Sequence, residues 1–398
     1  MNRTRITMID GIRGFSLLGI LLANLLIFQY GFWGKDQIDL FSLSQLDKGA
    51  YSFVKIFIEG SFMPIFTFLF GYSMVMMKEN LQRKALKVKR HFVRRAILLM
   101  TIGLLHGTFL WEGDILFFYG LMSLFLLLFL NRKKKTLFIW GIVLTLLVTA
   151  LGFGGGEQPF EEQQKVEAYV KETIVVYESG TYEEIRYHRN NESPMDFDSV
   201  ELIIILLLAP LVIAPMFLFG MYAAKKRAFT EKKQSISFYL INAIIFVPVG
   251  ILLKSFAHFY PLEMWTSASG LLGSMSLSFG YIFFFALIFS KFESSWLLKA
   301  FTNVGKLSMT NYLMQTIICT TIFYGYGLGL FGKVGVLNSL FIGLFIFGCQ
   351  VIASTVYLKF LKIGPFEKVN RIWTYFSLSG KPKVKRGKQV DRLENISV

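Results

Sequence analysis

The chain has only two cysteines, four histidines and nine prolines among its 398 residues. Both cysteines, Cys319 and Cys349, lie inside apolar runs, which excludes a disulfide framework and a cysteine-rich metal site. Charged residues make up only 17% of the chain, too few to cover the surface of a soluble protein of this size. The sequence contains neither a Walker loop nor a dinucleotide-binding glycine fingerprint. We therefore predict no metal site and no common nucleotide-binding fold.

Apolar residues dominate instead, at 54% of the chain, and the mean hydropathy is +0.52. Runs of about 20 apolar residues recur, each long enough to cross a hydrocarbon core of roughly 30 Å. The first run is too long for the core of a signal peptide and lacks a clear cleavage site. We predict an all-α polytopic membrane protein of about ten transmembrane helices. Their expected limits are 13–32, 53–77, 96–110, 115–130, 136–153, 201–224, 236–254, 267–290, 308–330 and 335–358.

Basic residues fall mainly in alternate connections between these spans. One set of connections, including both termini, holds 32 of the 42 lysines and arginines. The positive-inside rule then predicts that both termini are cytoplasmic, which requires an even number of spans. The same bias explains the formal charge of +16 without a nucleic-acid partner. The location predicted is the plasma membrane, in contact with membrane lipids.

The spans divide the chain into five predicted parts. A polar segment with eleven acids and four bases separates two helical bundles, and we expect it to lie outside the cell with a helix near 161–177. It would act as a lid or as a spacer. After the last span, apolar residues recur at helical spacing from Phe366 to Trp373, which predicts an amphipathic helix on the inner leaflet. The parts are the bundle 1–153, the acidic loop 154–200, the bundle 201–358, the interfacial helix 359–378 and a basic disordered tail 379–398.

The stretch LLHGTFLWEGDILFFYG, residues 104–120, places three ionisable residues in a turn between two short apolar runs. Because lipid would penalise such groups by several kcal/mol, we expect His106, Glu112 and Asp114 to face a protein-lined cavity near the outer surface. Glu59 is expected at similar depth. A histidine beside a carboxylate is suited to act as a general base. Alternatively, the turn is only a satisfied hydrogen-bond cluster in which Asp114 caps the following helix. The other histidines are expected to be peripheral: His91 and His188 on the solvated surface and His258 in a short outer connection.

A second candidate site lies at the predicted cytoplasmic side. We expect Arg13, Arg94, Arg95 and Lys306 to form a cationic inner mouth, which suits nucleotide phosphates. An amide-lined throat above it would suit a pantetheine arm, and its residues are Asn24, Asn311, Gln315 and Gln350. Alternatively, the cations only reach the lipid interface, and the amides only join helix to helix.

Several motifs resemble those of the YeiB-like family of bacterial membrane proteins. They are IDGIRGFSLLGILLANLLIF, SFMPIFTFLFGYSM, RRAILLMTIGLLHG, GDILFFYGLM, VGKLSMTNYLMQTIICTTIFYGYGLGLFG and GPFEKVNRIWTYF. The second half resembles that family's C-terminal domain of unknown function. The N-terminal part is also distantly similar to the heparan-alpha-glucosaminide N-acetyltransferase superfamily of transmembrane acyl transferases. No histidine lies between Asn24 and Lys55, so His106 is assigned from this sequence alone.

That distant resemblance implies transfer of an acyl group, such as acetyl, from cytoplasmic acyl-CoA to an acceptor across the membrane. We therefore expect acetyl-CoA or another acyl-CoA as donor, and an extracytoplasmic hydroxyl or amine on a glycan, a polymer or a lipid headgroup as acceptor. The rival hypothesis is a small-solute transporter or permease that makes no bond. A purely structural partner of another membrane protein is a third. Glycine-rich span faces also allow a homodimer.

Overall fold

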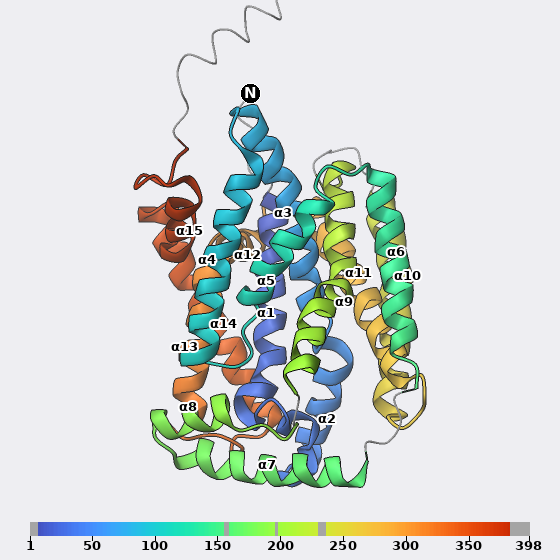
Figure 1. The fold of residues 1–398 in the computed structure, drawn as a ribbon, viewed down its shortest axis with the longest axis vertical. Helices are drawn as coiled ribbons and strands as arrows, with labels where there is room; N and C mark the ends of the chain where they lie inside the picture. Colours follow the sequence, from blue (N-terminus) through green and yellow to red (C-terminus); the bar gives the residue numbers. More distant parts are fainter. Residues whose placement is uncertain (1–6, 155–158, 196–197, 230–235, 383–398) are drawn as a thin grey trace, which may run out of the picture.

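The computed structural model describes residues 7–154, 159–195, 198–229 and 236–382, and all regular structure in these ranges is helical (Figure 1). The predicted all-α class is confirmed. The α-helices are α1 (Thr7–Tyr30), α2 (Gln45–Phe53), α3 (Met63–Arg83), α4 (Val88–Phe109), α5 (Leu116–Phe125), α6 (Lys134–Leu151), α7 (Phe160–Ser179), α8 (Tyr182–Asn191), α9 (Ser199–Lys225), α10 (Ile236–Phe259), α11 (Thr266–Lys291), α12 (Trp296–Lys306), α13 (Ser308–Phe323), α14 (Val336–Phe360) and α15 (Pro365–Tyr375). The 3₁₀ turns are η1 (Gly34–Asp36), η2 (Ile38–Leu40) and η4 (Leu126–Leu128), and η3 (Val54–Ile58) is a π-helix.

Helices occupy all ten regions predicted to span the membrane. Within the described residues, eight helical stretches are long and apolar enough to cross a bilayer. The two shorter ones are α5 with η4, and α13, which has 16 residues. The chain is thus a polytopic membrane protein, while the count of ten spans and the sidedness stay predictions. Large apolar side chains cover the outer faces of the bundle, among them Leu252 and Phe345, which are 70% and 73% exposed. Such faces suit contact with hydrocarbon.

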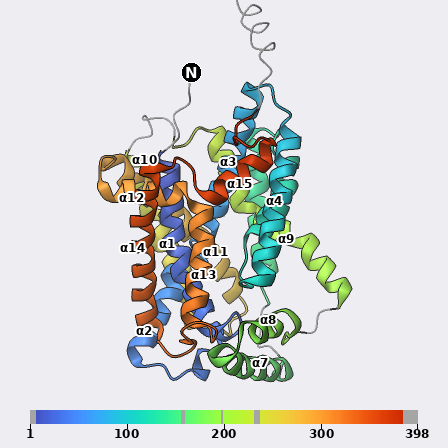
Figure 2. The same ribbon diagram turned by 90° about the vertical axis from the view of Figure 1, so that its left-hand side faces the viewer.

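The helix ends gather at two opposite poles of the molecule. The start of α1 lies at the same pole as α15, whereas α2, α7 and α8 lie at the other (Figures 1 and 2). Lys78 of α3 and Lys225 of α9 both donate to the carbonyl of Leu130 at 3.2 Å, so three connections meet near the first pole. These are connections that the basic residues assign to the cytoplasm.

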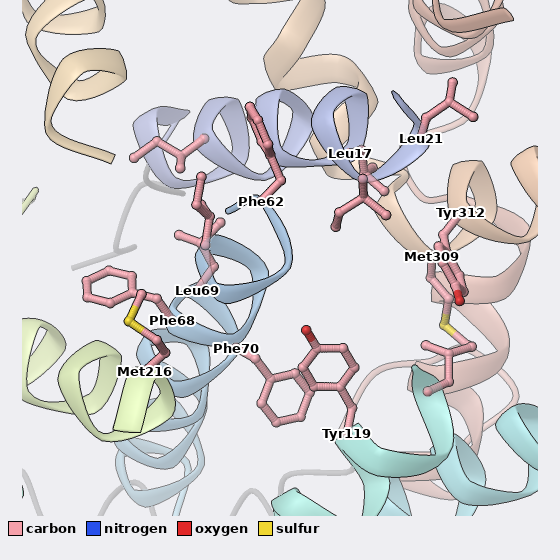
Figure 3. Packing of buried hydrophobic residues seen from close by; sticks show 14 of the residues in the cluster. Leu17, Leu21, Phe62, Phe68, Leu69, Phe70, Tyr119, Met216, Met309 and Tyr312 are labelled. Atoms are coloured by element: carbon pink, nitrogen blue, oxygen red, sulfur yellow. The ribbon is translucent and has the colours of Figure 1, made fainter. Parts of the chain in front are cut away.

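Glycines allow pairs of helices in the core to touch along their backbones. A Cβ on Gly14 of α1 would lie 2.0 Å from the carbonyl oxygen of Phe301, on α12. A Cβ on Gly220 of α9 would lie 1.9 Å from the carbonyl oxygen of Phe68, on α3. Figure 3 shows part of the apolar core, to which α1, α3, α5, α9 and α13 contribute side chains such as Leu17, Phe70, Tyr119, Met216 and Tyr312.

The second predicted span, 53–77, is interrupted. The π-helix η3 continues α2, the chain turns at residues 59–62, and α3 then begins at Met63. Gly60 adopts a φ of +70° in this turn, a conformation that glycine tolerates. Pro64 sits in the first turn of α3, where its missing N–H costs nothing. The second span is therefore divided by a helix break just before the proline.

The remaining predicted parts differ in detail from the structure. The acidic loop contains two helices, α7 and α8, where one was predicted. The connection 291–306 contains α12, which was not predicted. The interfacial helix is shorter than 359–378 and corresponds to α15. Most of the predicted tail, residues 383–398, lies outside the described residues.

Candidate functional site

His106 and Asp114 meet across the turn between α4 and α5. Nδ1 of His106 lies 2.8 Å from Oδ2 of Asp114, and both side chains are buried. The other carboxylate oxygen, Oδ1, accepts from the backbone N–H of Phe117 at 2.9 Å, which caps α5. The carboxylate therefore contacts the histidine with one oxygen and the first turn of α5 with the other.

Two glycines bring α4 and α5 close enough for this contact. A Cβ on Gly103 would lie 2.1 Å from the backbone N of Phe117 and 2.5 Å from Oδ1 of Asp114. A Cβ on Gly120 would lie 2.4 Å from the side chain of Met100. Side chains at either position would push the helices apart, so these glycines fix the distance at which the histidine meets its carboxylate.

The second ring nitrogen of His106, Nε2, is buried and has no hydrogen-bond partner among the described residues. A carboxylate only accepts, so Nδ1 carries the proton that faces Asp114 and the neutral ring keeps a lone pair on Nε2. Tyr312 of α13 lies beside the ring, with centroids 5.6 Å apart, and its hydroxyl donates to the carbonyl of Gly113 at 3.3 Å. The arrangement thus presents one free basic nitrogen in a protein interior.

The helix α8 covers the turn at the pole where α2 and α7 also lie. Arg189 donates to the carbonyls of Leu110 and Thr108, each at 2.9 Å. The hydroxyl of Tyr182 donates to the carbonyl of Phe109 at 2.8 Å. These bonds satisfy carbonyls that the last turn of α4 would otherwise leave unpaired. The acidic loop therefore includes a lid over the turn that carries His106.

Glu112 points toward this lid rather than toward His106. Its Oε2 lies 4.0 Å from Nε of Arg189, too far for a hydrogen bond, and both atoms are buried without a partner among the described residues. Burial raises the pKa of Glu112, and the Arg189 guanidinium offsets part of that rise. The two charges line a cavity of about 390 Å³ that also includes Trp33, Tyr169 and Tyr177.

Glu59 belongs to a different cluster. Its carboxylate forms ion pairs with Lys35 at 2.9 Å and with Lys55 at 2.5 Å, and Asp36 pairs with both lysines. The Glu59 carbonyl accepts from Lys254 of α10, a buried lysine that also donates to Ser61 at 2.9 Å. The structure therefore assigns Glu59 to the break in the second span and gives its carboxylate lysine partners instead of His106.

Three of the four predicted inner cations line one cavity of about 240 Å³. They are Arg13, Arg95 and Lys306, joined there by Lys362 and Arg371, which were not predicted. Glu367 also lines it, and its carboxylate accepts from the backbone of Met309 and Thr310 at the start of α13. Arg13 is already paired with Asp10 at 2.9 Å, and the remaining excess of cations over carboxylates makes this cavity attractive to anions.

Arg94 and Asn24 lie outside this cavity's lining. The guanidinium of Arg94 stacks on the ring of Phe376 at 3.9 Å, and its carbonyl accepts from the indole of Trp373 at 2.7 Å. These contacts attach α15 to α4. Asn24 is half-buried on α1.

The predicted amides on α13 and α14 form one buried network. Gln315 donates to the side chain of Gln350 at 2.9 Å, and Gln350 donates to the carbonyl of Asn311 at 2.9 Å. Asn311 donates to Ser354 at 3.0 Å. These hydrogen bonds join α13 to α14, which is the structural role that the sequence allowed as an alternative to ligand binding. Asn311 and Gln350 also line a largely apolar groove of about 540 Å³ between the two helices.

The prediction that His91 and His188 lie on the solvated surface is wrong. Both are buried, at 7% and 2% exposure. His91 contacts the carbonyl of Lys87 at 2.7 Å inside its own helix. His188 stacks on Tyr169 and bonds to Glu192 and Thr173, which holds α8 against α7. The burial of His188 could not be predicted from the sequence. The helix α8 is short and mostly polar, so its small apolar face gives only a weak periodic signal.

Sequence reasoning also missed Arg189 and Lys254. Arg189 is one of only four basic residues in the acidic loop, a scarcity that could have drawn attention to it. Lys254 lies inside an apolar run, where a lysine must find polar partners. Its partners come from residues 59–61, almost 200 positions away, and no local pattern indicates them.

These features define an all-helical polytopic membrane protein with a histidine–carboxylate pair in a covered turn and a cationic cavity at the opposite pole. Residues 223–377 match the family described as a protein of unknown function, DUF418. The chain is 32% identical over 407 residues to the uncharacterized protein YxaH of Bacillus subtilis (strain 168), covering 98% of both chains. It therefore belongs to the YeiB-like DUF418 family of membrane proteins.

Two further relatives extend over nearly the whole chain. An uncharacterized 39.9 kDa protein encoded in the amylase 3' region of Bacillus acidopullulyticus is 26% identical, covering 93% of this chain and 94% of its own. The uncharacterized protein YeiB of Escherichia coli (strain K12) is 26% identical, covering 90% and 93%. No solved structure matches.

Proposed function

We propose that this protein is a bacterial plasma-membrane acyltransferase that carries an acyl group from cytoplasmic acyl-CoA to an extracytoplasmic hydroxyl or amine. The single observation that carries the proposal is the state of His106. Its Nδ1 is held by Asp114, while its Nε2 is buried and has no partner in the part of the chain that the structure describes. This is the arrangement of a general base whose tautomer is fixed by a carboxylate.

The donor would bind at the other pole. The phosphates of CoA would lie among Arg13, Arg95 and Lys306, with Lys362 and Arg371 adding positive charge. Ser308 lines the same cavity, and Tyr312, one helical turn further along α13, lies beside His106. One helix therefore links the anion cavity to the candidate base, which supports a route for the thioester between them.

The reaction uses the free nitrogen of His106. The acceptor's oxygen or nitrogen attacks the thioester carbonyl while Nε2 takes its proton. The carbon–sulfur bond breaks, and the CoA thiolate leaves and receives a proton from the imidazolium. Asp114 stabilises the charged ring between these steps. A route in which His106 itself is first acylated uses the same residues and stays open.

The test uses purified protein and acetyl-CoA labelled in the acetyl group. We expect slow thioester hydrolysis, or transfer of label to an added acceptor, that depends on His106. Micromolar, salt-sensitive binding of CoA to the solubilised protein is expected as well. Absence of CoA binding would overturn the proposal.

A second candidate function is transport of a small solute, and one observation favours it. The second span is broken by η3 and the turn 59–62, and ion pairs of Glu59 with Lys35 and Lys55 lie at the break. Discontinuous helices with charged partners are a feature of secondary transporters. Solute uptake by proteoliposomes without CoA binding would favour this alternative.

A further inference from the structure

The outer cavity under the lid contains two charged atoms that each lack one hydrogen bond. Nε of Arg189 and Oε2 of Glu112 face each other at 4.0 Å, and both are buried without a partner among the described residues. The Arg189 side chain is only 4% exposed. Leaving a buried donor or acceptor unsatisfied is costly. Two such atoms beside one cavity indicate a ligand group that enters the cavity and forms a hydrogen bond with each of them.

The rest of Arg189 is already fixed. Each of its two terminal nitrogens donates to a carbonyl, of Leu110 or of Thr108, and Nε is the buried nitrogen that has no partner among the described residues. Glu112 can only accept when ionised. A group that serves both residues must accept one hydrogen bond and donate another, and a neutral hydroxyl does this. An ammonium cannot accept from Arg189, and a phosphate dianion cannot donate to Glu112.

The walls of the cavity suit a ring that carries several hydroxyls. Its volume of about 390 Å³ falls within the range of small-molecule sites, which runs from roughly 300 to 1,000 Å³. Trp33, Tyr169 and Tyr177 supply aromatic surface, and Asn190 and Asn191 supply amide groups. Tyr169 is held by a stacking contact with His188, with centroids 4.8 Å apart. Rigid aromatic rings beside fixed polar groups can hold an amphipathic ring by its face and its edge.

The charges of the lining do not favour an ion. Arg189 faces Glu112, and the other lining acid, Glu192, is bonded to His188. The cavity contrasts in this respect with the inner one, where cations outnumber carboxylates.

We propose that this outer cavity binds a neutral polyhydroxylated ring, such as a sugar or cyclitol, with one hydroxyl bridging Glu112 and Arg189. The binding of the ring does not depend on the proposed acyltransferase function. Only the role of the bound ring as the acyl acceptor rests on that function. The turn that carries Glu112 also carries Asp114, the partner of His106, so the ligand would lie against the same segment as the candidate base.

The experiment measures binding to the full-length protein in detergent, without CoA, by saturation-transfer NMR. The neutral probes are methyl β-glucoside and myo-inositol, and the charged probes are glucosamine and glucose 6-phosphate. We expect saturable binding of a neutral probe that is at least about fivefold tighter than that of either charged probe. Tighter binding of a charged probe, or no binding of either neutral one, would overturn the proposal.

Matched variants test the two bridging residues. Glu112→Gln keeps the shape of the side chain and removes its charge, and Arg189→Lys removes Nε–H; each should weaken binding about fivefold or more. Glu167→Gln, which removes an exposed carboxylate on α7, should bind as the wild type does. Thermal melting checks that each variant is folded. If Arg189→Lys does not fold, the binding measured for Glu112→Gln decides whether the bridging site exists. If the protein binds the neutral sugar but not CoA, the acyltransferase function alone is refuted. If it binds CoA but neither neutral probe, this outer site alone is refuted.

Discussion

His106 and Asp114 are joined by a 2.8 Å hydrogen bond across eight residues of sequence, at the point where two short helices turn back on each other. The bond is hidden from the outer surface by α8 and placed at the end of α4. Among the described residues, one imidazole nitrogen has no partner and lies in the interior. Substitutions at the two residues separate the chemical role of this pair from its structural role.

Replacing His106 with alanine should lower acyl transfer or thioester hydrolysis by about 10²- to 10⁴-fold, because the base that accepts the acceptor's proton is lost. CoA affinity should not change, since the cations lie in another cavity. The measurement is release of labelled acetate or labelled product from acetyl-CoA. His258→Gln, at the far end of α10, is the matched control and should leave the rate unaltered. Equal rates for His106→Ala and the wild type would remove His106 from the mechanism.

Asp114→Asn tests what the carboxylate does for the histidine. Asparagine can still cap α5 through its carbonyl oxygen, so the melting temperature should change little. It cannot stabilise the imidazolium, so the rate should fall by about tenfold or more. The rate and the melting temperature are measured on the same preparation. A variant that loses stability but keeps its rate would show that Asp114 is only a helix cap.

Neutralising the inner cavity should weaken the binding of CoA. Arg95→Gln and Lys306→Gln each remove one cation that can contact phosphate, and each should raise the dissociation constant about tenfold. Added salt should weaken wild-type binding as well, because partly exposed charges are screened. Binding is measured by calorimetry, with Lys359→Gln on the exposed face of α14 as the control. The anion site would be refuted if both cavity variants bound CoA as tightly as the control does.

Long apolar runs made most of the fold predictable. Helices occupy all ten predicted spans, although a turn interrupts the second, because a run of some 20 apolar residues has few other ways to satisfy its backbone in a membrane. A contact between His106 and a carboxylate of the same turn was predictable for a local reason, but the sequence did not decide between Glu112 and Asp114. The inner cluster was partly predictable, because basic residues at the ends of spans collect at one membrane surface.

Contacts between distant segments could not be predicted in the same way. The lid depends on Arg189 reaching carbonyls of residues 108 and 110, about 80 positions earlier. Glu59 was expected near His106 on grounds of depth alone, and depth does not determine which face of the bundle a residue occupies. Of its actual partners, Lys55 lies close in sequence and Lys35 does not, and the π-helix that contains Lys55 has no clear sequence signal.

Removing Arg189 should destabilise the lid. Arg189→Ala loses two hydrogen bonds to carbonyls at the end of α4, which should lower the free energy of unfolding by about 2 kcal/mol. Thermal melting in detergent detects the change. Lys171→Ala, which removes a 63% exposed partner of Glu167 on α7, should have almost no effect. Equal melting temperatures for the two variants would show that α8 is not held by Arg189.

The stability of the protein should carry a pH dependence due to Glu112. Burial raises the pKa of this carboxyl in the folded protein, so the folded state holds its proton more tightly than the unfolded state does. The contribution of Glu112 to stability should therefore fall as pH rises from the ordinary glutamate pKa, about 4.3, through the raised value. Glu112→Gln should melt above the wild type at pH 7, and the difference should shrink toward pH 4. A difference that grows toward low pH would contradict this sign, and Glu161→Gln on α7 serves as the exposed control.

The contact between α1 and α12 joins the first helix to the C-terminal half of the chain, and glycine is required on both sides of it. A Cβ on Gly305 would lie 1.8 Å from the carbonyl oxygen of Asp10, and one on Gly14 would lie 2.0 Å from that of Phe301. Neither backbone atom can move without shifting a helix, so Gly14→Ala and Gly305→Ala should each destabilise the protein by about 2 kcal/mol or more. Gly348→Ala on α14 is the matched control, because a Cβ there meets nothing within 4 Å. Helix propensity alone would make all three substitutions slightly stabilising. Only close packing predicts that Gly14→Ala and Gly305→Ala lower the stability while Gly348→Ala does not. Thermal melting of the three variants therefore tests directly whether the first helix docks on the C-terminal half as the structure places it.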